Sequence, residues 1–112
     1  MLTPLSPYEV RDLLASGEAR LIDIRSPGEF ASERIAGAEN MPLPNVPKID
    51  GGKKVIFMCL SGARVASAMP ELEKAAGGPA YVLDGSMIGW KRAGLPVEAA
   101  ARTGIFGGMF GR

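Results

Sequence analysis

The sequence predicts an α/β domain with a mainly parallel sheet, and three observations support this fold class. First, the chain has 112 residues, which suits one domain with a substantial core and is too short for two. Second, short apolar runs typical of strands alternate along the chain with longer stretches typical of helices. Third, the run "KKVIFMC" is almost wholly apolar, as expected of a parallel strand that is covered on both faces.

The first predicted helix covers residues 7–16. Ser6 can cap this helix, Pro7 suits its first position, and Glu9 completes a capping box. Three aliphatic residues give the helix one apolar face: Val10, Leu13 and Leu14. Gly17 is a typical C-terminal stop, so we expect the chain to leave the helix there.

A short buried strand is expected next, within "ARLIDIRS". This run holds three large aliphatic residues, Leu21, Ile22 and Ile24, and a charged residue follows them. The helix start signal then recurs, with Ser26 as the cap, Pro27 in the first position and Glu29 in the third. This signal predicts a short second helix over residues 27–33.

A turn into another short strand is expected in "RIAGAENMP". Residues 42–53 then contain three prolines and two glycines, which exclude a long helix or a central strand. We interpret this segment as a surface loop. It leads into the apolar strand within residues 53–59.

The second half of the chain continues the alternation. "GARVASAMPELEKAAGG" predicts one helix, and Pro70 should kink it by removing the hydrogen bond to Ala66. "AYVLDG" is typical of another buried strand. "SMIGWKRAGLPV" predicts a last helix that Gly94 ends.

The domain is predicted to cover residues 1–98, followed by a Gly-rich apolar tail at 99–112. Four glycines alternate there with large apolar residues, and glycine disfavours both helix and strand. We expect this tail to be flexible. A partner-binding or self-packing segment is the alternative, because large apolar residues close together rarely stay exposed without a purpose.

Composition excludes several classes of function. The net charge is +1 and the 13 basic residues are scattered, so we expect no nucleic-acid partner. Histidine is absent and there is one cysteine, which excludes Ser/His/Asp and Cys/His catalysis, an intrachain disulfide and a multi-thiolate zinc site. We therefore expect no metal and no cofactor. Without a signal peptide or a run of about 20 apolar residues, we predict a soluble cytoplasmic protein with no membrane span.

The single cysteine, Cys59, stands in the stretch "CLSGARV", where a buried strand ends and a helix soon begins. Ligand sites of open α/β sheets lie at the carboxyl ends of strands. A turn with Ser61 and Gly62 can direct backbone N–H groups toward one point, and a helix N-terminus adds positive potential. These groups would stabilise a thiolate without any histidine, and Arg64 would add a fixed cation. A free cysteine is also often a buried packing residue, and this second interpretation stays open at this point.

Four blocks of sequence resemble the single-domain rhodaneses, which are thiosulfate:acceptor sulfurtransferases. The blocks are "LIDIRSPGEF", "RIAGAENMP", "VIFMCLSGARVAS" and "YVLDGSMIGWKRAGLPV", in the order of that family. The resemblance as a whole covers about residues 3–98. The resemblance implies a rhodanese-like fold, with a mainly parallel five-stranded sheet flanked by helices on both faces. It also implies that a loop cysteine takes a sulfane sulfur from a donor, holds it as a persulfide and passes it to an acceptor.

The resemblance gives roles to particular residues. Cys59 would be the nucleophile, and the amides of the loop would form its cradle: Leu60, Ser61, Gly62, Ala63, Arg64 and Val65. Arg64 would contact donor oxygens. Asp23 and Arg25 would tie the central strand to neighbouring loops, with Glu29 as the partner of Arg25 and as a helix cap. Trp90 is expected in the core.

The spacing between the cysteine and the arginine of the loop distinguishes a sulfurtransferase from the related phosphatases and arsenate reductases of the same fold. They use C-x5-R, whereas Cys59 and Arg64 form C-x4-R, whose smaller loop fits a persulfide sulfur better than phosphate. Arg34 replaces a histidine that is usual in the family, and its packing is an open question. Leu60 and Ala63 replace charged or polar residues, which weakens the case for thiosulfate as the physiological donor.

Two functions therefore remain. The first is a sulfurtransferase with a small sulfur-containing anion, such as thiosulfate, or a persulfide as donor, and a thiol, cyanide or protein as acceptor. The second is a persulfide carrier or regulatory module that serves one protein partner with little turnover of small molecules. The sequence does not indicate the oligomeric state.

Overall fold

The computed structural model describes residues 1–99 and contains one five-stranded sheet in which all neighbouring strands are parallel. The strand order is β1-β5-β4-β2-β3, so β4 lies at the centre. The strands are β1 (Thr3–Leu5), β2 (Ala19–Asp23), β3 (Glu39–Asn40), β4 (Lys54–Met58) and β5 (Ala80–Leu83). The helices are α1 (Pro7–Ser16), α2 (Pro27–Ser32), α3 (Ala63–Ser67), α4 (Met69–Ala76) and α5 (Ser86–Arg92).

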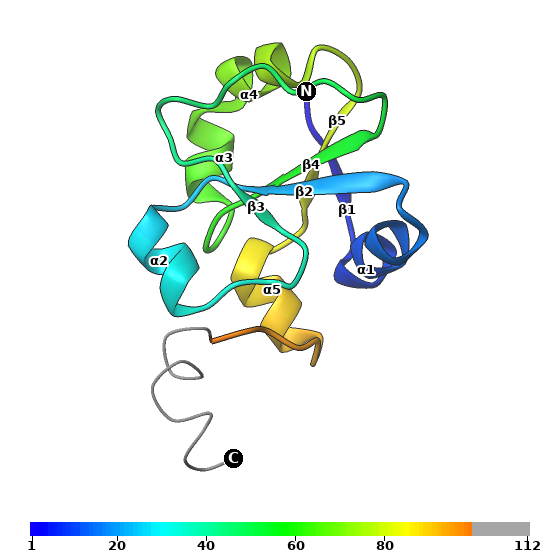
Figure 1. Cartoon of the computed structure of the whole chain (residues 1–112), viewed down its shortest axis with the longest axis vertical. Helices are drawn as coiled ribbons and strands as arrows, with labels where there is room; N and C mark the ends of the chain where they lie inside the picture. Colours follow the sequence, from blue (N-terminus) through cyan, green and yellow to red (C-terminus); the bar gives the residue numbers. More distant parts are fainter. Residues whose placement is uncertain (100–112) are drawn as a thin grey trace.

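Helices cover both faces of the sheet, which confirms the predicted fold class. In Figure 1, α3 and α4 lie above the sheet, and α1 and α5 lie below it. Neighbouring residues of one strand accordingly enter two separate cores. Phe57 of β4 packs with Leu72 of α4, whereas Ile56 packs with Val10 of α1 and Trp90 of α5. A strand that is buried on both faces must be apolar, which explains why residues 55–58 of β4 are all hydrophobic, whereas Lys54 at its start is exposed.

The first two helices begin as predicted. Both caps, Ser6 and Ser26, form complete capping boxes with the glutamate three residues later. Gly17 ends α1 in the left-handed conformation (φ 77°), which glycine adopts without strain. The second helix ends at Ser32, one residue before the predicted limit. These boundaries follow from local hydrogen bonds, so the sequence alone was enough to find them.

The region around Pro70 differs from the prediction. One kinked helix was expected over "GARVASAMPELEKAAGG", but the structure has two helices, which meet at Ala68. Proline lacks an N–H group, and it therefore suits the first turn of a new helix better than the interior of a long one. The break leaves α3 as a short five-residue helix behind the Cys59 loop.

The first strand, β1, was not located by the sequence pattern. It has three residues and pairs with β5 at the edge of the sheet, with Pro4 opposite Val82. An edge strand tolerates proline, since one side of its backbone needs no partner. Residues 42–53 contain no helix or strand, as predicted.

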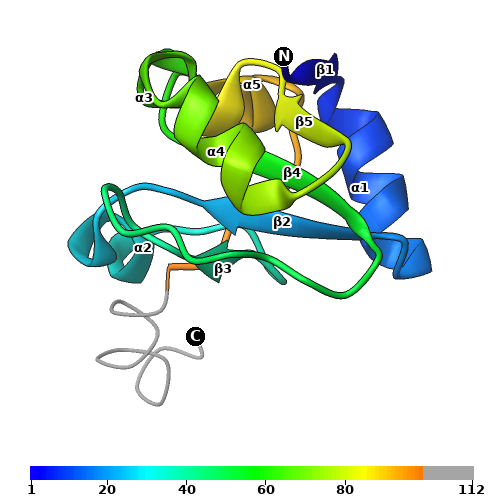
Figure 2. The ribbon, with the colours of Figure 1, turned by 90° about the horizontal axis from the view of Figure 1, so that it is seen from above.

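Figure 2 shows the described domain from above, with α4 in front of α5. Apart from Ala99, the tail that was predicted over residues 99–112 lies outside the described residues. No helix within residues 1–99 combines the length and hydropathy that crossing a bilayer requires.

Candidate active site

Cys59 lies directly after the last residue of β4, at the carboxyl end of the central strand. Only 1% of the residue is exposed, and it packs in the same core as Val65 of α3. The chain turns through residues 60–62 before α3 begins. The position at the carboxyl end of a central parallel strand is the one at which open α/β sheets bind ligands.

The turn after Cys59 directs a backbone amide at its sulfur atom. Gly62 has φ 105°, and its N–H group donates to Sγ of Cys59 over 3.1 Å. The next amide, of Ala63, donates instead to the hydroxyl oxygen of Ser61 over 3.4 Å. Glycine reaches this φ without the steric cost that a side chain would bring. Gly62 is therefore the member of the predicted cradle whose amide contacts the sulfur in this structure.

The other predicted cradle residues have different surroundings. Leu60 is 43% exposed, although it directly follows the buried cysteine. Val65 is 1% exposed and fills the core beneath the loop. These two side chains thus lie on opposite sides of the turn, one facing solvent and one facing the core.

Ser86, a residue that the sequence analysis did not single out, contacts Cys59 directly. Its Oγ accepts a hydrogen bond from the Cys59 amide over 3.1 Å and lies 3.9 Å from Sγ. Ser86 is fully buried, and in the described part of the chain it is the one non-glycine residue with positive φ (51°). The signal that could have found it is its position just after β5, because the ends of neighbouring parallel strands lie together.

Backbone hydrogen bonds reinforce the contact between the Cys59 loop and the start of α5. The amide of Met87 donates to the carbonyl oxygen of Cys59 over 3.1 Å, and that of Ile88 donates to Leu60 over 3.0 Å. The first amides of a helix lack partners within the helix, so they are available for such bonds. The first turn of α5 therefore holds the loop in place.

Arg64 forms a bidentate ion pair with Glu29, with N–O distances of 2.8 and 3.0 Å. This corrects the expectation that Glu29 pairs with Arg25, while the predicted capping role of Glu29 is confirmed. The hydrogen bonds from Arg64 are the main reason why the pKa of Glu29 falls to about 2. The pair joins α2 to α3 beside the loop, and it already engages the cation that was expected to contact donor oxygens.

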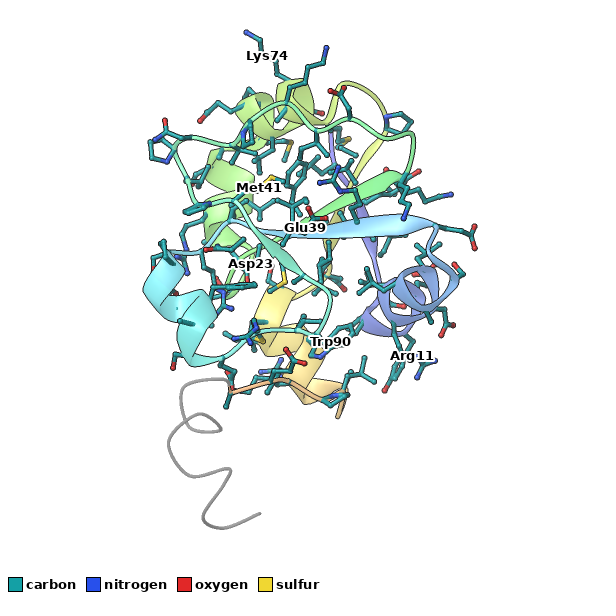
Figure 3. All side chains as sticks on the ribbon, viewed as in Figure 1. Arg11, Asp23, Glu39, Met41, Lys74 and Trp90 are labelled. Atoms are coloured by element: carbon teal, nitrogen blue, oxygen red, sulfur yellow. The ribbon has the colours of Figure 1, made fainter. Side chains whose placement is uncertain are left out.

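Arg25 pairs instead with Asp23, and both side chains are buried. Its Nε and Nη2 donate to the carboxylate over 2.8–3.1 Å, and Nη2 also donates to the Glu33 carbonyl oxygen over 2.7 Å. The side chain of Asn40 in β3 donates to the backbone carbonyl oxygens of Asp23 and Arg25, which holds the turn after β2 in place. Asp23, labelled in Figure 3, is the last residue of β2. Their contacts link β2 to β3 and to the end of α2.

Arg34 and Trp90 lie away from the loop. The backbone of Arg34 forms an antiparallel bridge with Glu98, and its guanidinium group contacts the carboxylate of Glu98 and lies over the ring of Phe30. Trp90, labelled in Figure 3, is 4% exposed and donates from Nε1 to the Pro96 carbonyl oxygen over 2.8 Å. Trp90 is therefore a core residue, as predicted.

A model of the rhodanese-like domain family matches residues 6–93 of this sequence. The chain belongs to the rhodanese-like domain family. It is 36% identical over 83 residues to a sulfurtransferase of Allochromatium vinosum, an alignment that covers 70% of this chain and 78% of the relative. The family assignment accounts for the parallel sheet and for the four blocks of sequence on which the resemblance was based.

Other relatives differ in length. The chain is 31% identical over 97 residues to the Synechocystis protein slr1261, covering 82% of this chain and about half (54%) of that protein. A rhodanese-related protein of Thermoplasma volcanium has a similar structure, with a TM-score of 0.73, 22% identity and coverage of 86% of this chain and 97% of the other. At this identity, the structural likeness shows the fold alone.

Proposed function

We propose that the protein is a sulfurtransferase that takes a sulfane sulfur from thiosulfate or a persulfide onto Cys59 and passes it to a thiophilic acceptor. The observation that carries this proposal is the Gly62 amide, which lies 3.1 Å from Sγ at the carboxyl end of the central strand. An amide aimed at sulfur favours the thiolate, which is the nucleophilic form. Membership of the rhodanese-like domain family supports the same chemistry.

The proposed cycle has two displacement steps. In the first, the Cys59 thiolate attacks the sulfane sulfur of thiosulfate, a new S–S bond forms, and the donor S–S bond breaks with its electron pair leaving on sulfite. In the second, cyanide or a thiolate attacks the outer sulfur, and the electron pair of the broken S–S bond returns to Sγ. Both steps conserve charge, so the cycle needs no external oxidant or reductant.

The pairing of Arg64 bears on the identity of the donor. Its guanidinium group is already held by Glu29 in two hydrogen bonds, so an anionic donor must share or displace that carboxylate. A persulfide donor has no sulfonate-type oxygens, so it does not depend on this cation to the same extent. We therefore propose thiosulfate as a usable assay donor and a thiol-bound or protein persulfide as the physiological donor. The reducing cytoplasm, where such persulfides and an unpaired thiol persist, is the proposed location.

A persulfide carrier that serves one protein partner is the second candidate. Leu60 and Ile88 favour it, because both are exposed (43% and 41%) and a backbone hydrogen bond joins them beside Cys59. Exposed apolar side chains next to a reactive group suit contact with another protein. The two candidates differ in turnover: steady production of thiocyanate from thiosulfate and cyanide supports the enzyme, and single loading without turnover supports the carrier.

Mass spectrometry of the intact protein tests the sulfur chemistry itself. After incubation with thiosulfate, the wild-type chain should gain the mass of one sulfur atom, and cyanide should remove it. Cys59→Ser is the matched control, and it should gain nothing. The proposal fails if the wild-type chain forms no adduct with thiosulfate, with a glutathione persulfide or with an alkyl persulfide.

A further inference from the structure

The start of α5 contains an unusual backbone conformation at Ser86. Ser86 has φ 51°, a conformation in which a side chain is strained and for which glycine is the usual choice. Gly85, directly before it, has φ 74°. Strained residues of this kind persist where the surrounding structure holds them, and they gather at functional sites.

The hydroxyl group of Ser86 contacts Cys59. Oγ accepts the Cys59 amide proton over 3.1 Å, so its own proton remains free to be donated elsewhere. The acceptor that it faces is Sγ of Cys59, at 3.9 Å. This distance is long for a hydrogen bond. We expect it to shorten when the sulfur carries negative charge, because charged acceptors form shorter and stronger bonds.

The contact is shielded from water, which strengthens it. Ser86 is fully buried and Cys59 is 1% exposed. Gly62 supplies its amide to the same sulfur atom at 3.1 Å. Gly62 also lies near Ser86, because a Cβ built on Gly62 would be 3.9 Å from the Ser86 hydroxyl oxygen. Two donors from different segments, the Gly62 amide and the Ser86 hydroxyl group, thus face Sγ. Both contacts lie in the protein interior, where hydrogen bonds are stronger than in water.

We propose that Ser86 is a positioning residue for sulfur transfer, which fixes the backbone of Cys59 and donates a hydrogen bond to its sulfur when that atom is a thiolate. The inference rests on the proposed function. Sγ is a thiolate before it attacks the donor, and it becomes one again as the leaving group when the acceptor takes the outer sulfur. The hydroxyl group therefore assists both steps without giving up its proton.

Two substitutions separate the hydroxyl group from the backbone strain. Ser86→Ala removes the hydroxyl group and keeps the strained backbone, whereas Ser86→Gly removes the hydroxyl group and relieves the strain. Ser32→Ala, on the exposed end of α2, is the control. All three are made in the full chain, and the rate of alkylation of Cys59 by iodoacetamide is measured at one fixed pH, beside urea unfolding.

We expect both Ser86 variants to alkylate about tenfold more slowly than the wild-type chain and the control, the size of one lost hydrogen bond to a charged group. The glycine variant should be the more stable of the two to urea, so that reactivity does not follow stability. Wild-type reactivity in Ser86→Gly would overturn the inference, because the hydroxyl group would then contribute nothing to the reactivity of Cys59. If Ser86→Ala does not fold, the glycine variant decides alone.

Sulfur transfer supplies the second readout. Loading from thiosulfate and unloading to cyanide should both slow by a similar factor in the two Ser86 variants. If the wild-type chain loads sulfur and the variants load it equally fast, the role of Ser86 is refuted and the proposed function stands. If the wild-type chain accepts sulfur from no donor, the proposed function fails, and the alkylation rates still decide whether Ser86 supports the thiolate.

Discussion

Two arginine–carboxylate pairs hold the segments around Cys59, and they differ in burial. Arg25 and Asp23 are 4% and 0% exposed, whereas Arg64 and Glu29 are 40% and 35% exposed. Both pairs are joined by more than one hydrogen bond. The geometry is therefore similar, and the surrounding medium is the main difference.

That difference separates a structural pair from an adjustable one. Charges that are removed from water depend strongly on each other, because a buried ion without its partner carries a large desolvation cost. Charges at the surface are solvated with or without a partner, and their attraction is screened. The buried pair thus maintains the turn after β2, whereas the exposed pair can be rearranged by a ligand, by pH or by substitution.

Removal of one member of the buried pair should have the largest effect. Arg25→Met leaves the Asp23 carboxylate buried without its cation, and the free energy of unfolding should fall by about 3–5 kcal/mol. Urea unfolding followed by circular dichroism measures this. The double variant with Asp23→Asn is the control and should lose less than Arg25→Met alone, since no buried charge remains. An equal or larger loss in the double variant would contradict the assignment of the cost to the unpaired charge.

Glu29→Gln should have a moderate effect, and on two different quantities. The free energy of unfolding should fall by only about 0.5–1 kcal/mol, because the pair is exposed and glutamine can still complete the capping box. Loading of sulfur from thiosulfate should become about two- to fivefold faster, since Arg64 is released to contact the donor anion. The measurement is the initial rate of adduct formation by mass spectrometry.

The control for this substitution is Glu33→Gln, which removes the exposed ion pair of Glu33 with Lys91. It should leave the loading rate unchanged. An alkyl persulfide, which has no oxygen atoms for Arg64 to bind, should load Glu29→Gln and the wild-type chain at the same rate. Slower loading of Glu29→Gln from thiosulfate would show that the carboxylate helps the donor and does not compete with it.

The smallest effect concerns the pH dependence of the exposed pair. The pKa of Glu29 is about 2 in the folded chain, below its ordinary value of 4.5, chiefly because of the hydrogen bonds from Arg64. A lowered pKa stabilises the folded state above pH 4.5, and this contribution is lost as the pH falls from 4.5 toward 2. The difference in stability between wild type and Glu29→Gln should therefore be constant near neutrality and disappear near pH 2. A difference that grows on acidification would refute this linkage.

Sequence reasoning succeeded where the signal was local. The capping boxes at Ser6 and Ser26 involve residues three positions apart, and the buried strand before Cys59 is visible in its apolar run. The position of Cys59 at a strand end follows from that same run. These features depend on neighbours in the chain, so composition and spacing were enough to place them.

Sequence reasoning failed where the residues that contact each other are distant in the sequence. Arg64 was expected to contact donor oxygens, and its partner in the structure, Glu29, lies 35 residues away in α2. Ser86 lies 27 residues from Cys59 and resembles an ordinary helix start. The strand β1 is too short for a periodic pattern and forms through pairing with β5. Each of these features required the arrangement of the strands to be known first.

The pairing of β4 with β5 also bears on which changes in chain length this protein can accommodate. Phe57 lies opposite Val82, and this register brings the two strand ends, with Cys59 and Ser86 beyond them, to one place. An insertion between α4 and β5 leaves the register intact and should be tolerated. One extra residue inside β5 would shift its end by about 3.3 Å and separate the serine from the cysteine. Insertions in natural variants should therefore occur in the connection between α4 and β5 and be absent from β5, and engineered insertions should be tolerated only in that connection.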